Sequence, residues 1–427
     1  MVGGAESRPQ GSDRAREKGV CDLTRILVLG GAGQVASHAV RELAAEQDVS
    51  AITVADRDHE AALHLASELG DRVSAVAIDA NDHIGLVAAA RGHDVVANAI
   101  DPFRCHEARV AHAAIEAGVP YLSRCDDYDS ARTVLVLDDA ARVAGVTVLS
   151  GMGWTPGLSN VLARKAAERF DLLDEVNVAW GGSAVGPEGY AVILQVLDSL
   201  SGLVPSYQNG RHVHLKAGSG REAVLFPPPV GRLNCYHLRH PEPLTLPRFL
   251  PGLRAVSLKG GFSEQALTDL VVGLARLGLA GTPVRRDLIA RLVKAAAPYA
   301  RRLGTAAEPC SALRVDAGGW ENGAYRQVSY GVAAPVHKLT ALPLAVGALM
   351  LGRGEVRVPG VVAPEACIEP SPFLADLEGR GVTVQDMTGR WAEPEGVRLA
   401  PSAASLVLIA LAAWFLLGWL HGRRARG

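Results

Sequence analysis

The sequence has little of what marks several classes of protein. Its 427 residues include six cysteines, and no two of them form a C-x-x-C pair, which argues against a zinc site and is typical of a reducing compartment. The formal net charge is −2, so the chain lacks the basic excess typical of nucleic-acid-binding proteins. The first twenty residues contain no apolar run, and we expect no secretory signal peptide there. We therefore predict no bound metal and no nucleic-acid partner.

A glycine-rich turn separates an apolar run from a helical stretch near the N-terminus. The run 26–29 is typical of a buried strand, and Gly30, Gly31 and Gly33 follow it directly. Either of the first two glycines would permit a tight turn, and Gly33 would let the backbone approach a pyrophosphate at the start of the next helix. Small Ala36 would let that helix pack on the strand. A turn of this kind can also connect strand and helix without binding anything.

An acidic residue after the next strand favours the binding function. The apolar run 51–55 ends at Asp56, twenty residues beyond Ala36, where an acid that binds the ribose hydroxyls is expected. A 2′-phosphate beside Asp56 would place two anions in contact, although Arg57 could offset that repulsion. We therefore predict NAD(H) as the cofactor, with NADP(H) as the alternative.

The first 150 residues alternate short apolar runs with helical stretches, the pattern of a doubly wound parallel sheet, and so predict an α/β Rossmann domain. The expected strands are 26–29, 52–55, 74–78, 95–98, 121–122 and 147–149. Ligands of such sheets bind beyond the carboxyl ends of the strands. The residues predicted there to bind the cofactor are Gly30, Gly31, Gly33, Gln34, Val35, Asp56, Arg57, Asp79, Asn98, Ala99, Ile100 and Asp101. Asp79 could accept a hydrogen bond from the adenine amine, or serve only as a loop acid.

Several motifs together resemble a known family. They are the glycine loop, Ala55-Asp56-Arg57, Asn98-Ala-Ile-Asp-Pro-Phe103, Ala114-Ile-Glu-Ala-Gly-Val-Pro-Tyr121, Gly151-Met-Gly-Trp-Thr-Pro-Gly-Leu-Ser159, and the segments 222–231 and 360–365. In these segments the chain resembles the saccharopine dehydrogenase family, which includes saccharopine reductase, lysine 6-dehydrogenase and carboxynorspermidine dehydrogenase. The resemblance spans about residues 24–385. The chain departs from the family pattern at Thr155, where the family usually has an acid. It also departs in the loop that begins at Asn98, where the usual family sequence is Asn-Ala-Ala-Pro-Pro.

The resemblance implies a chemistry and an organisation. It implies NAD(P)-dependent hydride transfer at a C–N (amine or imine) bond of an amino-acid-type substrate, and we expect a homodimer. Between about residues 175 and 330 the pattern changes to period-two runs, which favours an α+β domain. The expected parts are a disordered 1–23, a Rossmann domain 24–155, an α+β substrate and dimerisation domain 156–340, a segment 341–385 that returns to the Rossmann domain, a linker 386–401, a transmembrane helix 402–420 and a basic tail 421–427.

Hydride transfer to an imine requires protonation of its nitrogen, so an acid is expected near the nicotinamide. Asp126 and Asp127 follow a predicted strand, and either could reach the substrate or cap the next helix. Trp154 follows two glycines and could line the nicotinamide site or pack in the core. We predict these three residues as catalytic, with Asp126 first. By position, the other candidate acids and bases are Asp101, Glu222 and Lys259.

An uncharged stretch closes the chain. Residues 402–420 carry no charge and are followed by three arginines. Nineteen helical residues rise roughly 28 Å, about one bilayer core. This predicts a single-pass membrane anchor with the catalytic domain in the cytoplasm, where the nucleotide pool lies, although flanking arginines argue for the opposite orientation. A buried oligomerisation helix is the alternative.

Two functional classes remain open. One is an oxidoreductase that acts on an amine, an imine or a lipid-borne small-molecule substrate. The other is a non-catalytic NAD(P)-binding sensor or scaffold. They differ in whether polar groups of the second domain converge on the nicotinamide end of the cofactor crevice.

Overall fold

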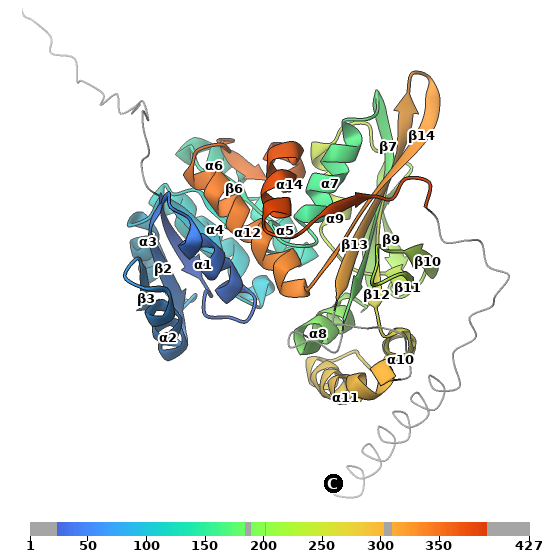
Figure 1. Cartoon of the computed structure of the whole chain (residues 1–427), viewed down its shortest axis with the longest axis horizontal. Helices are drawn as coiled ribbons and strands as arrows, with labels where there is room; N and C mark the ends of the chain where they lie inside the picture. The colour runs from blue at the N-terminus through green and yellow to red at the C-terminus, as the bar shows by residue number, and fades with distance from the viewer. Residues whose placement is uncertain (1–23, 184–188, 201, 303–309, 391–427) are drawn as a thin grey trace, which may run out of the picture.

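The computed structural model describes residues 24–183, 189–200, 202–302 and 310–390. These residues form two β-sheets with helices packed on their faces, and the two sheets lie side by side (Figure 1). The N-terminal part of the described chain builds the first sheet, and the middle part builds the second.

The first sheet consists of seven parallel strands in the order β15-β6-β5-β4-β1-β2-β3. They are β1 (Thr24–Leu29), β2 (Val49–Asp56), β3 (Val73–Ala77), β4 (Val95–Asn98), β5 (Tyr121–Ser123), β6 (Thr147–Leu149) and β15 (Gly360–Val362). Ile26, Leu27 and Val28 are completely buried, because helices cover both faces of a parallel sheet and its strands must be apolar on both sides. The predicted α/β Rossmann sheet is confirmed.

Three of the six helices after the strands of this sheet begin at a capping side chain. The helices after its strands are α1 (Ala36–Ala45), α2 (His59–Leu69), α3 (His83–Arg91), α4 (Phe103–Ala117), α5 (Tyr128–Leu135) and α6 (Asp138–Ala144). Asp58, Asp82 and Asp127 accept hydrogen bonds from backbone N–H groups in the first turns of α2, α3 and α5. Helix α1 has no side-chain cap.

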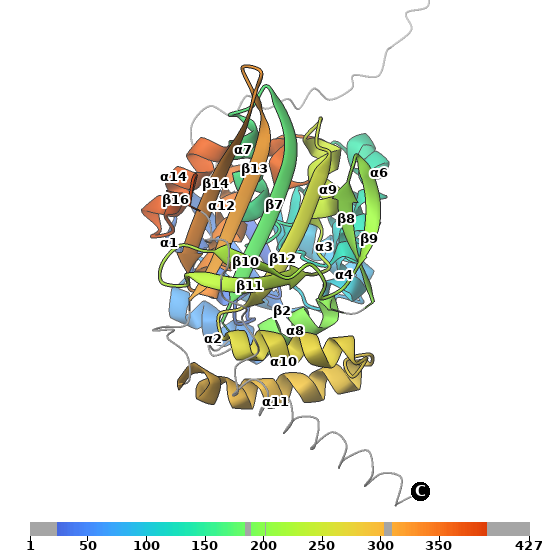
Figure 2. The ribbon, with the colours of Figure 1, turned by 90° about the vertical axis from the view of Figure 1, so that its right-hand side faces the viewer.

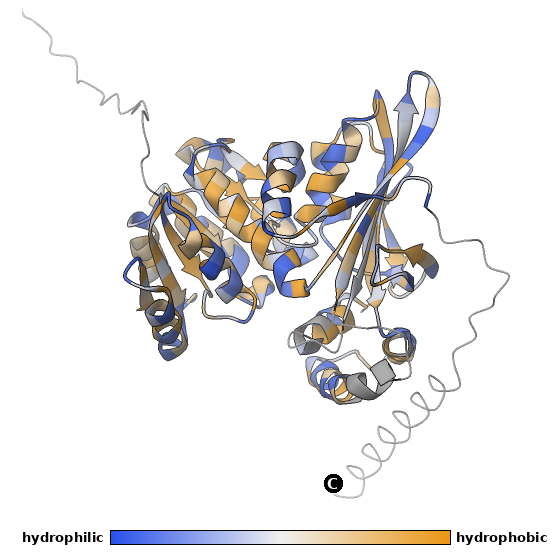
Figure 3. Ribbon diagram, in the orientation of Figure 1, coloured by the Kyte–Doolittle hydropathy of each residue, from blue (hydrophilic) through white to orange (hydrophobic). Residues whose placement is uncertain are grey.

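The segment after residue 335 crosses back to the first sheet. Helix α12 (Val336–Gly352) packs on α1, and β15 then extends the sheet beside β6. Nearly every residue of α12 from Leu339 to Gly352 is buried, and its ribbon is apolar on all sides (Figure 3). An all-round apolar helix is typical of a domain core. The short helices α13 (Pro364–Cys367) and α14 (Pro370–Gly379) follow.

The second sheet is mixed. Its order is β10-β11-β12-β7-β13-β14-β16, with β8 paired to β12 and β9 to β8. The strands are β7 (Leu172–Gly182), β8 (Leu203–Gln208), β9 (Arg211–Lys216), β10 (Glu222–Leu225), β11 (Arg232–His237), β12 (Ala255–Phe262), β13 (Ser311–Glu321), β14 (Ala324–Ala334) and β16 (Val384–Asp386). Asn322 and Gly323 both have positive φ at the β13–β14 turn, the backbone that a two-residue hairpin favours.

The remaining helices are α7 (Leu158–Ala167), α8 (Gly189–Ser199), α9 (Glu242–Phe249), α10 (Gln265–Arg276) and α11 (Pro283–Arg302). Helices α8, α10 and α11 gather at one end of the second sheet (Figure 2). Helix α7 packs against the face formed by β7, β13 and β14. Gln195 of α8 lines the cavity that runs from the first sheet to the second.

The prediction of a membrane-anchored chain with a cytoplasmic catalytic domain is wrong as far as the described residues show. Within them, no helix combines the length and apolar character that crossing a bilayer requires. A span needs about 20 apolar residues, and the apolar helix α12 has 17 residues and is buried. The predicted helix at 402–420 lies outside the described residues, as do 1–23 and 391–427.

Candidate functional site

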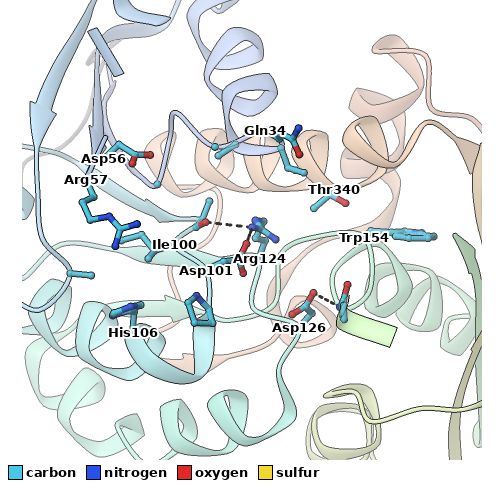
Figure 4. Close-up of a pocket in the computed structure, with 18 of the residues that line it drawn as sticks. Gln34, Asp56, Arg57, Ile100, Asp101, His106, Arg124, Asp126, Trp154 and Thr340 are labelled. Carbon is cyan, nitrogen blue, oxygen red and sulfur yellow. Dashed lines mark hydrogen bonds and ion pairs between the residues drawn. The ribbon is translucent and has the colours of Figure 1, made fainter. Parts of the chain in front are cut away.

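One cavity of about 550 Å³ runs from the glycine loop of the first domain to the second sheet. Asp56 and Arg57 lie at one end of it, Asp126 and Trp154 at the other, and Asp101 between them (Figure 4). Of the residues predicted to bind the cofactor or act in catalysis, those that line the cavity are Gly30, Gly33, Gln34, Val35, Asp56, Arg57, Asp79, Ala99, Ile100, Asp101, Asp126 and Trp154. Gly31, Asn98 and Asp127 do not.

The glycine loop fits a pyrophosphate. Gly30 has φ +72°, and a Cβ there would lie 3.0 Å from the backbone of Ala99 and Ile100. A side chain would therefore push the two loops that border the cavity apart. No side chain caps α1, and the N–H groups of Ser37 and His38 donate to the backbone carbonyls of Gly33 and Val35, so the helix start offers an anion the N–H groups that precede them. Gly31 acts differently: its Cβ would meet the carbonyl oxygen of Val28 at 3.0 Å, so it permits packing on the strand.

The ribose end of the cavity combines an anionic and a cationic side chain. Oδ2 of half-buried Asp56 accepts a 3.2 Å hydrogen bond from the N–H of Ala32, and its Oδ1 accepts one of 3.0 Å from Asp58. Asp56 therefore also fixes the glycine loop. Exposed Arg57 lies beside it in the cavity wall. Asp79 accepts hydrogen bonds from the backbone and side chain of Asn81, as a loop acid does.

Asn98 was predicted to bind the cofactor, but it does not line the cavity. Asn98 is completely buried, and its amide donates to Glu107 and to the hydroxyl of Tyr121 at 3.0 and 2.9 Å. Its Oδ1 accepts from the N–H of Ile100 at 3.0 Å. Asn98 thus holds the loop from the protein interior, while Ala99 and Ile100 line the cavity.

Glu107 is the acceptor that holds this buried group together. It receives hydrogen bonds from Asn98 and Ser123, and burial raises the pKa of its carboxyl to about 7. We expect Glu107→Ala to lower the free energy of unfolding by about 3 kcal/mol, because two buried donors lose their acceptor and a cavity forms. Urea unfolding measures this. Glu116→Ala on the exposed side of α4 is the control and should leave the midpoint unchanged; equal effects would contradict the assignment.

The two neighbouring aspartates after β5 have different roles. Asp127 caps α5, with its Oδ1 2.8 Å from the N–H of Ser130, so the prediction that it acts on substrate is corrected to a capping role. Asp126 lines the cavity and accepts a hydrogen bond from the side-chain amide of Gln195 on α8. Burial raises the pKa of Asp126 to about 6, close to the operating range of a general acid or base.

Arg124 and Asp101 form an ion pair in the wall between the two ends. The guanidinium of Arg124 also lies over the ring of Phe103, 5.1 Å from its centroid. The pair joins the loops after β4 and β5, and so fixes the cavity wall between the cofactor loop and Asp126.

The second sheet contributes the far wall. Trp154 packs edge-on against Trp180 of β7, with ring centroids 5.6 Å apart. Nδ1 of buried His240 lies 2.8 Å from Oε2 of buried Glu242. Burial alone would lower the pKa of His240, but the nearby carboxylates of Glu242 and Asp126 outweigh it and raise that pKa. Trp180, Gln195 and His240 therefore meet Asp126 and Trp154 at one point.

Sequence reasoning missed these second-domain residues and chose others. Glu222 and Lys259 form an ion pair between β10 and β12 and do not line the cavity. The local sequence offered one weak signal for His240, a histidine and an acid two residues apart around a proline. Among the described residues, His83, His112 and Glu116 form one group that could hold a metal ion; it is exposed on α3 and α4, outside the cavity.

Comparison with known proteins agrees with this geometry. Residues 26–149 match the family model for the saccharopine dehydrogenase NADP binding domain. The segment 26–149 is thus similar to the cofactor-binding domain of the saccharopine dehydrogenase family. The prediction from the motifs is confirmed, and the protein is an NAD(P)-dependent oxidoreductase. Its cofactor is accordingly NAD(P), and the uncapped start of α1 and the close approach at Gly30 fit that cofactor.

One solved structure extends the likeness in fold to the second domain. The apo saccharopine dehydrogenase (L-Glu forming) of Saccharomyces cerevisiae is 18% identical, with a TM-score of 0.60 over 85% of this chain and 99% of the yeast chain. The C. glutamicum DAP dehydrogenase in complex with DAP is 13% identical, with a TM-score of 0.43 over 84% of this chain and 99% of that chain. The yeast enzyme thus shares the fold of both domains of this chain.

Proposed function

We propose that the protein transfers hydride between NAD(P) and the carbon of a C–N bond in a small-molecule amine or imine. One observation carries the proposal: Trp180, Gln195 and His240 of the second domain converge with Asp126 on the cavity that begins at the glycine loop. A sensor or scaffold would have no need of a buried acid and a buried His–Glu pair at that end. The convergence therefore favours catalysis over the sensor function.

The bound cofactor would supply or accept the hydride, and the protein would supply orientation and proton transfer. Gly30, Gly33 and the start of α1 would hold the pyrophosphate, and Asp56 the adenosine ribose. In the direction of amine oxidation, the carboxylate of Asp126 would take the proton of the substrate ammonium, so that the nitrogen lone pair can form the C=N bond as hydride leaves. In reduction Asp126 would return that proton.

His240 would act beside Asp126. Its ring is held by Glu242 at 2.8 Å, and Oε1 of Glu242 accepts a further 2.9 Å hydrogen bond from Ser159. These contacts fix the imidazole in one orientation. A fixed imidazole close to Asp126 could relay the proton or bind an oxygen of the substrate.

Turnover screening tests the proposal. Purified protein would be assayed with amines and NAD(P)⁺, and with aldehyde–amine mixtures and NADH or NADPH, by absorbance of the reduced nicotinamide. We expect turnover with at least one amine or imine. Tight cofactor binding with no turnover on either substrate class would favour the sensor function.

The cofactor preference is a separate prediction. We expect NADH to bind more tightly than NADPH, because Asp56 would lie against the 2′-phosphate. Titration of both reduced cofactors by fluorescence measures the two dissociation constants. Arg57→Ala should weaken NADPH binding and leave NADH binding unchanged. Tighter binding of NADPH by the wild type would contradict this preference.

A further inference from the structure

The substrate end of the cavity carries an excess of negative charge. Arg124 is paired with Asp101, and His240 lies 2.8 Å from Glu242, so each cation already faces a carboxylate. The third carboxylate, Asp126, receives its hydrogen bond from an uncharged amide, that of Gln195.

The other basic side chains among the described lining residues lie elsewhere. Arg57 and His106 line the opposite end of the cavity, near Asp56 (Figure 4). None of the described lining residues is a lysine. Among the described residues that line the cavity, a substrate bound next to Asp126 therefore meets no cation that lacks a carboxylate partner.

Two aromatic rings complete this end. Trp154 and Trp180 are 9% and 4% exposed, and both line the cavity. The face of an indole attracts a cation. Both indole N–H groups are buried without a hydrogen-bond partner in the described part of the chain. The indole N–H is an uncharged donor and suits a neutral oxygen of a ligand. A carboxylate of the ligand would instead require a cation of the protein when it is buried.

We propose that the substrate is an amine without a carboxylate beside its reacting carbon, bound with its ammonium or iminium nitrogen next to Asp126 and close to the rings of Trp154 and Trp180. This inference rests on the proposed hydride transfer at a C–N bond. It excludes an amino acid that reacts at its own α-carbon, which is one form of the amino-acid-type substrate that the family resemblance implied. A substrate carboxylate a few ångström from Asp126 would weaken binding by roughly tenfold or more, even at the high effective dielectric of a protein surface.

Matched amines that differ only in that carboxylate test the inference. Suitable pairs are phenethylamine with L-phenylalanine and tyramine with L-tyrosine, because each amino acid of these pairs has its amine on the α-carbon alone. Binding is measured by calorimetry on the NADH-saturated protein, where an amine cannot be oxidised, and turnover is measured separately with NAD(P)⁺. We expect the member without the carboxylate to bind at least ~10-fold more tightly in each pair that binds.

Two substitutions at one tryptophan separate the ring from its N–H. Trp154→Leu should weaken amine binding by roughly 3- to 30-fold, the scale of a cation–π contact, and Trp154→Phe should retain most of the affinity. Trp320→Leu is the control, since Trp320 lies on β13, is 44% exposed and does not line the cavity. NADH affinity, measured on all three variants, reports whether the cofactor domain is intact.

The outcomes are distinct. Equal or tighter binding of the carboxylate-bearing members overturns the inference and leaves the proposed function standing if those members turn over. Failure of every amine and amino acid to bind the NADH-saturated protein, or to turn over, overturns the proposed function and the inference together.

Discussion

Asp126→Asn is expected to slow turnover by at least ~100-fold, the usual scale of general acid–base catalysis, with NADH affinity retained. The substitution keeps an oxygen that can accept the hydrogen bond from Gln195, but it removes the titratable group. No cofactor-loop residue changes. Steady-state kinetics on any amine that turns over, together with an NADH titration, measure both quantities.

The same variant has a signature in the pH dependence. Burial raises the pKa of Asp126 to about 6. The carboxylate must be ionised to accept the proton of an ammonium, so kcat/KM for amine oxidation should fall as the pH drops below about 6. That limb of the profile should be missing in Asp126→Asn.

The adjacent aspartate provides the matched control. Asp127→Asn keeps a capping oxygen for the N–H of Ser130, and asparagine caps helices about as well as aspartate. Its turnover and pH profile should equal those of the wild type. If both variants slowed turnover alike, the effect would come from the β5–α5 loop as a whole, and Asp126 would lose its assigned role.

Gly30→Ala is expected to weaken NADH binding by roughly 10- to 100-fold, since ~1–3 kcal/mol of strain at one residue corresponds to one or two powers of ten. Gly30 has φ +72°, and an added Cβ would lie 3.0 Å from the backbone of Ala99 and Ile100. Relief of that contact requires the glycine loop or the β4–α4 loop to shift. Both loops line the cavity.

Gly70 separates the close approach from the backbone conformation. It has φ +86°, and a Cβ there would meet nothing within 4 Å. Gly70→Ala should therefore cost some stability, as any L-residue does at such a φ, and leave NADH affinity unchanged. Equal losses of affinity in the two variants would show that the approach at Gly30 is not what positions the cofactor loop.

The sequence alone determined the cofactor half of this protein. The apolar run 26–29, the glycines after it and Asp56 are local signals: a strand, a turn and a strand end. Parallel strands place their carboxyl ends at one edge of a sheet, so chain order was enough to bring Gly30, Asp56 and Asp101 to one cavity.

Tertiary packing decided what each polar residue at that edge does. Asn98 and Asp127 follow strands as Ile100 and Asp126 do, yet Asn98 is buried against Glu107 and Asp127 caps α5. A capping aspartate and one that faces a cavity have the same sequence pattern. Only the neighbours in space distinguish them.

The second-domain residues of the substrate end were invisible to sequence reasoning, although Asp126 and Trp154 at that end were predicted. Trp180, Gln195 and His240 stand on a strand, a helix and a loop of the second domain, and they reach Asp126 only because that domain packs against the edge of the first sheet. Glu222 and Lys259 had equally suitable chemistry but pair with each other on β10 and β12. Nothing periodic or local encodes which side chains meet across two domains, so that half of the site was decided by the tertiary structure.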